Sequence, residues 1–175
     1  YYYFHSFSYA WLRMDPQVVL DQLPPDVNKQ DSALVYLRIL QCKAAQYGKT
    51  RYGEKGPLLT EELDNLFRDY PNARVIHMVR DPRAVVYSHF TMPWSTSSFI
   101  GANVMVNVNM RTITQHGERV LAVKLEDLLA EPEATLRKVL DFVGVEWSEN
   151  VLHHVEHLPE NDGIPFPWLM DASRR

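Results

Sequence analysis

The feature that most constrains the fold is the segment Ala73–Phe90, ARVIHMVRDPRAVVYSHF. Its apolar first half predicts a buried strand over Ala73–Val79. Asp81 and Pro82 then break the strand, because proline lacks an N–H and suits the first turn of a helix, while aspartate suits the N-cap before it. The segment therefore predicts a strand, a tight turn and a helix over Pro82–Phe90.

A junction of this kind is where α/β proteins bind phosphate, because the free N–H groups and the dipole of the helix both favour an anion. Arg80 at the strand tip and Ser88 two turns along the helix would both face that anion. Arg83 would reach either the anion or the solvent. The alternative is a buried Arg–Asp pair that only stabilises the turn.

Apolar spacing and helix-breaking residues predict the other elements. The expected helices are Tyr1–Leu23, Asp31–Tyr47, Thr60–Tyr70, Ala102–His116, Pro132–Val143 and Trp147–Glu156. Further strands are expected at Thr50–Glu54 and Val120–Leu125, with a turn at Asp127–Leu129. Strands that alternate with helices predict an α/β fold with a parallel sheet and helices on both faces.

Length and composition narrow the class of protein. The 175 residues predict one domain, 1–175. The net charge of −4 argues against a general nucleic-acid binder, since such domains are usually basic. Cys42 is the single cysteine, which excludes an internal disulfide and a Cys-based zinc site, and we expect no metal. No apolar run approaches the roughly 20 residues of a membrane span, and a cytoplasmic location is expected.

The strand–turn–helix segment resembles the 3′-phosphate-binding segment of sulfotransferases that use 3′-phosphoadenosine 5′-phosphosulfate (PAPS). In that family an Arg closes a strand and a Ser lies eight residues later, as Arg80 and Ser88 do here. Upstream, RYGEKGP at Arg51–Pro57 resembles a GEKTP-type motif of bacterial and carbohydrate sulfotransferases. Downstream, Val120–Val145 resembles the family's strand–YEDL–helix–FLG segment. The likeness covers Lys49–Trp147.

The chain departs from the family pattern at two places. Leu125 replaces the tyrosine of YEDL, although Glu126 and Asp127 match, and Asp127 is expected mainly to cap a helix. The phosphosulfate loop, a Pro-(Lys/Arg)-Ser-Gly-Thr-like run after a strand, is not found in the sequence, which starts at Tyr1. The resemblance therefore implies a three-layer, P-loop-like parallel sheet that lacks its first βα unit. We expect the 175-residue piece alone to be inactive.

The resemblance also implies roles for individual residues. Arg80 and Ser88 would bind the 3′-phosphate, with Arg83 as a further cofactor-binding candidate. Lys55, 25 residues before Arg80, lies close to where cytosolic sulfotransferases place a catalytic lysine that stabilises the leaving phosphate. The alternative is that Lys55 is a solvated loop lysine.

The general base is open. Cytosolic sulfotransferases carry a histidine two residues after the lysine, where this chain has Pro57. Glu54 is the nearest carboxylate, and carbohydrate sulfotransferases often use a glutamate. His89, beside Ser88, is the other catalytic candidate. Each of these residues has a structural alternative, an ion pair for Glu54 and a packing role for His89.

The sequence thus predicts part of a sulfotransferase that transfers a sulfuryl group from PAPS to a hydroxyl or amine of a small-molecule or carbohydrate acceptor. The alternative is a non-catalytic, sulfotransferase-like binding or scaffold domain. A relative of P-loop kinases is a third reading, against which the lack of a GK[ST] run counts.

Overall fold

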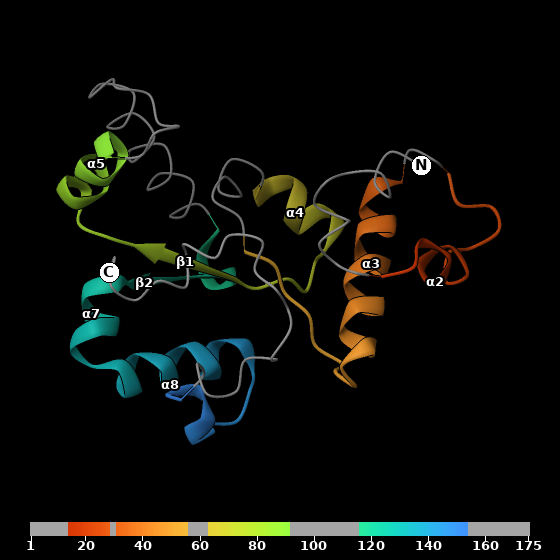
Figure 1. The fold of residues 1–175 in the computed structure, drawn as a ribbon. Coiled ribbons are helices and arrows are strands. Elements are labelled where there is room, and N and C mark those ends of the chain that lie inside the picture. The colour runs from red at the N-terminus through yellow and green to blue at the C-terminus, as the bar shows by residue number, and fades with distance from the viewer. Residues whose placement is uncertain (1–13, 29–30, 56–62, 92–115, 154–175) are drawn as a thin grey trace. The chain divides into compact units, whose positions relative to one another are not determined.

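The computed structural model describes residues 14–28, 31–55, 63–91 and 116–153 (Figure 1). The chain divides into two compact units, Tyr1–Lys55 with Glu160–Arg175, and Gly56–Pro159.

The first unit is helical in its described part. Helix α2 (Pro16–Leu20) and helix α3 (Ser32–Gln46) each begin after an aspartate whose carboxylate accepts a backbone N–H of the first turn. Their apolar faces pack together in a small core of Met14, Val19, Ile39 and Cys42. This arrangement confirms the predicted helix at Asp31–Tyr47 and shortens the one at Tyr1–Leu23, of which residues 1–13 lie outside the described ranges.

The predicted strand Thr50–Glu54 is wrong. Residues 51–55 are exposed and have no regular secondary structure. A strand needs a neighbouring strand to pair its N–H and C=O groups, and the described residues of this unit contain none. The segment is tied to α3 instead by a hydrogen bond of 3.3 Å from the Gln41 amide to the Tyr52 hydroxyl.

The second unit contains a parallel pair of strands, β1 (Val75–Val79) and β2 (Val120–Lys124), as the sequence predicts. The register pairs Val75 with Val120 and Val79 with Lys124. Because the strands are parallel, their carboxyl ends lie at the same edge. Helix α5 (Pro82–Thr91) follows β1 at that edge and helix α7 (Leu125–Ala130) follows β2 (Figure 1).

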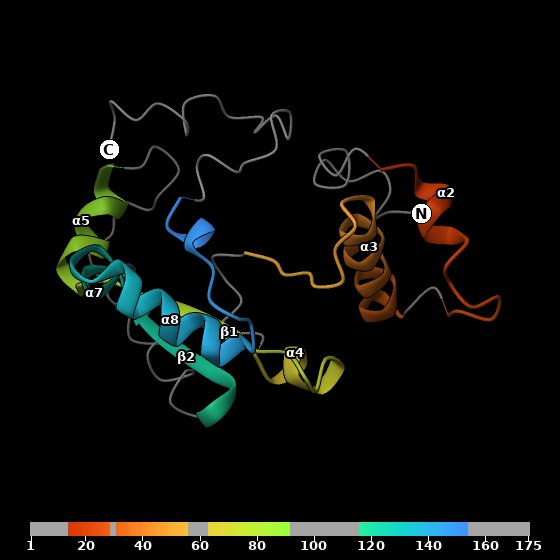
Figure 2. The same ribbon diagram turned by 90° about the horizontal axis from the view of Figure 1, so that it is seen from below.

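Helix α8 (Pro132–Val143) covers one face of the two strands (Figures 1 and 2; Figure 2 views this face from below). Its bounds are those predicted, because Pro132 starts it and Gly144 ends it in the left-handed conformation, at φ 68°. Thr135 of α8 donates its hydroxyl to the Asp127 carbonyl of α7 at 3.2 Å. This hydrogen bond ties α8 to the helix that follows β2.

Three other predicted elements change in the second unit. The turn expected at Asp127–Leu129 is part of α7, and Asp127 lies in its first turn while Lys124 occupies the N-cap. Acidic residues in a first turn favour a helix by their charge as well as by capping, which accounts for the difference. Helix α4 (Leu63–Asp69) ends one residue earlier than predicted, and residues 60–62 of that prediction lie outside the described ranges. In its described part, the last predicted helix appears as a 3-10 turn, η4 (Glu149–Val151). The expected Ala102–His116 helix lies outside the described residues except for His116.

The buried side chains of the second unit come from several elements, and include Leu63, Phe67, Val86, Val123 and Thr135. The strand β1 is not buried as predicted: it alternates between half-buried and exposed positions, because its opposite faces differ in their covering. Burial lowers the pKa of His77, which lies on the half-buried side of β1. The fold class is α/β, with helices around a small parallel sheet.

Candidate functional site

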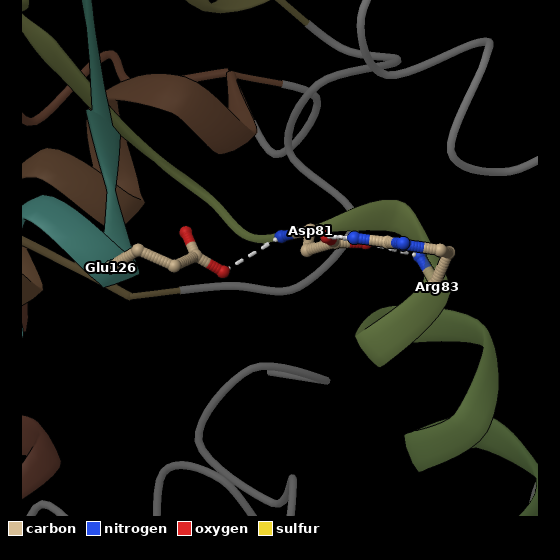
Figure 3. A network of polar contacts seen from close by, with 3 residues as sticks. All are labelled: Asp81, Arg83 and Glu126. Carbon is tan, nitrogen blue, oxygen red and sulfur yellow. Dashed lines mark hydrogen bonds and ion pairs between the residues drawn. The ribbon is translucent and has the colours of Figure 1, made fainter.

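The turn between β1 and α5 is organised by Asp81. Its Oδ1 accepts the backbone N–H of Arg83 at 2.8 Å, and the same carboxylate binds the Arg83 guanidinium, with Nη2 to Oδ2 at 2.6 Å (Figure 3). The side-chain hydrogen bond from Arg83 is the main cause that lowers the pKa of Asp81 to about 2. Asp81 therefore serves as the N-cap that the sequence predicts, and it is ionised near neutral pH.

Helix α7, which follows the neighbouring strand, supplies a second carboxylate. Oε1 of Glu126 accepts the backbone N–H of Asp81 at 2.9 Å, so this contact joins the ends of two strands whose residues are 45 positions apart (Figure 3). The hydrogen bond from the Asp81 N–H is the main cause that lowers the pKa of Glu126. The positive charge of Arg80 acts in the same direction, while the Asp81 carboxylate opposes it.

These two carboxylates change how an anion can bind at this junction. The N–H of Asp81 is engaged by Glu126, that of Arg83 by Asp81, and Pro82 has none. The N–H groups of Asp81 and Arg83, which were expected to be free at the start of α5, are therefore engaged.

The structure places the predicted phosphate-binding residues around this turn. Arg80 is exposed and directly follows β1, while Ser88 is half-buried in α5. The side chain of Arg83 is 91% exposed and pairs with Asp81. The alternative of a buried Arg–Asp pair is not found here, because Asp81 pairs with Arg83 at the surface.

The predicted catalytic residues come from both units. Lys55 and Glu54 are exposed at the end of the described part of the first unit. They belong to a different unit from Arg80 and Ser88. His89 lies in α5, and its side chain is outside what the structure describes.

Sequence reasoning matched Glu126 to a family motif but gave it no role. The available signal was its position: it is the second residue after β2, just as Asp81 is the second after β1. Parallel strands in register place such residues side by side.

No group of three or more His, Cys, Asp or Glu side chains in the described ranges is arranged to hold a metal ion. No helix of these ranges is long and apolar enough to cross a membrane.

Comparison with known proteins finds a matching family and similar sequences. A model described as the sulfotransferase family matches residues 11–149. A protein-tyrosine sulfotransferase of Drosophila melanogaster is 30% identical over 133 residues, which cover 70% of this chain and 27% of that protein. Protein-tyrosine sulfotransferase 2 of Gallus gallus is 29% identical over 164 residues, 87% of this chain and 42% of that protein. The chain thus spans less than half the length of these relatives.

Proposed function

Because the chain belongs to the sulfotransferase family, we propose that the protein containing it transfers a sulfuryl group from PAPS to an acceptor hydroxyl. One observation carries the proposal: Arg80 projects from the carboxyl end of β1, immediately before α5, inside the matched range. This is the edge of a parallel sheet where ligands of α/β proteins bind. We extend the proposal to a larger, P-loop-like sheet with helices on both faces, which the parallel pairing of β1 and β2 supports.

Arg80 and Ser88 are proposed to bind the 3′-phosphate of PAPS. Because the amides of Asp81 and Arg83 are engaged, this task is assigned to side chains. An arginine is suited to it, because its guanidinium can donate two parallel, charge-assisted hydrogen bonds to a phosphate. Ser88, on the helix that Arg80 precedes, would add a hydroxyl donor.

Lys55 and Glu54 are proposed to serve the chemical step. Sulfuryl transfer leaves charge on the departing phosphate, which the ammonium group of Lys55 would stabilise. The acceptor hydroxyl loses a proton, for which Glu54 or His89 would be the base.

For the acceptor we propose a tyrosine side chain of a protein. The relatives named above are protein-tyrosine sulfotransferases, an acceptor different from the small molecule or carbohydrate expected from the GEKTP-like motif. A free tyrosine hydroxyl has a pKa near 10, so it is protonated near neutral pH. A base is therefore needed to remove its proton when the sulfuryl group is transferred to it. Transfer to a tyrosine-containing peptide but not to sugars would support this choice.

The test of the phosphate site is Arg80→Ala in the intact protein. Loss of a charge-assisted phosphate contact should weaken binding of adenosine 3′,5′-bisphosphate by about 2–4 kcal/mol, as measured by calorimetry. The matched control is Arg74→Ala, at the opposite end of β1, where the guanidinium lies over the Phe142 ring at 5.2 Å. Equal affinity of Arg80→Ala and the wild type would refute the site. Binding without transfer to any acceptor would point to a scaffold domain instead.

A further inference from the structure

We propose that Glu126 is a positioning residue for this phosphate site, and that it acts through the backbone of Asp81 to hold Arg80 at the end of β1. The inference rests on the proposed function, because it assigns a partner to the arginine that binds the 3′-phosphate. Glu126 itself would not contact the nucleotide.

The first argument is the register of the sheet. Val79 pairs with Lys124, so Asp81 and Glu126 occupy equivalent positions just beyond the two strand ends. The hydrogen bond of 2.9 Å between them continues the link between the strands after the ladder has ended. It does so with a side chain, because β2 has turned into α7 and offers no backbone carbonyl in that register.

The second argument is that this contact lies at the surface. Glu126 is exposed, so water could solvate the Asp81 N–H if the carboxylate were removed. An exposed hydrogen bond of this kind contributes little to global stability. Its consequence is local: it fixes the direction in which the chain leaves β1.

The third argument concerns Arg80, which lies between two fixed residues. Val79 before it belongs to the strand ladder, and Asp81 after it is held at its N–H by Glu126 and at its carboxylate by the start of α5. The backbone of Arg80 is thereby restrained on both sides, and only its side chain has to be ordered when phosphate binds. Restraint of this kind improves affinity because less freedom is lost on binding.

The negative charge of Glu126 opposes phosphate binding, whereas its hydrogen bond to Asp81 supports it. A carboxylate near Arg80 competes with an incoming phosphate for the same guanidinium. The positioning role needs only an acceptor oxygen, which a glutamine also provides. Glu126→Gln should therefore bind phosphate as well as the wild type or better, whereas Glu126→Ala should bind it worse.

The experiment is calorimetry on the intact protein with adenosine 3′,5′-bisphosphate. Glu126→Ala should weaken binding about tenfold, because it removes one hydrogen bond near a charge. Glu126→Gln should stay within about twofold of the wild type or bind more tightly. The matched control is Asp127→Ala, which removes the adjacent carboxylate of the same helical turn and should leave the affinity unchanged.

Two further measurements separate positioning from a general loss of structure. Adenosine 5′-phosphate, which lacks the 3′-phosphate, should bind Glu126→Ala and the wild type equally. In an Arg80→Ala background, Glu126→Ala should cause no additional loss. Both results are expected if Glu126 acts through Arg80.

Three outcomes would overturn the inference: an unchanged affinity in Glu126→Ala, an equal loss in Glu126→Gln, or a parallel loss for adenosine 5′-phosphate. If Arg80→Ala alone has no effect, the proposed phosphate site fails, and the inference fails with it. If Arg80→Ala weakens binding and Glu126→Ala does not, the phosphate site stands and only the role of Glu126 is refuted.

Discussion

Replacing Gly144 by alanine tests how α8 is ended. Gly144 has φ 68° and ψ 47°, and its N–H and that of Val145 donate to the carbonyls of Asp141 and Leu140 at 3.0 and 2.8 Å. A Cβ built on Gly144 would meet nothing within 4 Å, so alanine adds no clash. The loss of stability in Gly144→Ala should therefore come from the backbone conformation alone.

The magnitude follows from two opposing terms. An L-residue in the left-handed region costs about 1–2 kcal/mol. Alanine also reduces the conformational entropy of the unfolded chain, which stabilises the folded state by about 0.4–1 kcal/mol. The free energy of unfolding of the second unit should therefore fall by about 1 kcal/mol in Gly144→Ala. Gly144→Asn should lose less, because asparagine tolerates this conformation better.

Denaturant unfolding followed by circular dichroism measures this difference, and hydrogen exchange at the amides of α8 assigns it to that helix. The backbone argument is refuted if Gly144→Ala is as stable as the wild type. It is also refuted if the asparagine variant is the less stable of the two.

Two other predictions concern the site. Lys55→Ala should lower kcat roughly 100-fold with little change in KM, and Lys55→Arg should recover little, as steady-state kinetics with PAPS would show. Near-normal kinetics in both would make Lys55 a solvated loop lysine. The low pKa of Asp81 means that its capping contribution is complete above pH 3.8 and is lost as the pH falls towards 2. An NMR titration of the Asp81 carboxyl should give a midpoint near 2 that rises in Arg83→Ala, whereas a wild-type midpoint near 3.8 would contradict this.

The strongest local patterns in the sequence predicted the central elements well. The run Val75–Val79 is apolar except for His77 and lies between two arginines, and Pro132 and Gly144 mark both ends of α8. These signals are local, so they do not depend on the rest of the chain. The α/β class followed from their alternation.

The sequence did not predict features that depend on long-range contacts. Thr50–Glu54 has a strand-like composition but no described neighbour to pair with in its unit. The contact from Glu126 to Asp81 requires the register of β1 and β2, which no single segment encodes. The same contact engages the Asp81 N–H, one of the amides that were expected to be free.

The charges of the β1–α5 turn explain why one arginine should dominate phosphate binding. Asp81 holds the guanidinium of Arg83 at 2.6 Å, so releasing Arg83 to a phosphate would break that ion pair. Arg80 forms no ion pair within the described part of the chain. The amides of Asp81 and Arg83 are engaged by carboxylates, whereas Arg80 offers a phosphate a charged donor with no ion pair to break in the described ranges. Arg83 should therefore fail to compensate for Arg80→Ala, although the two residues are only three positions apart.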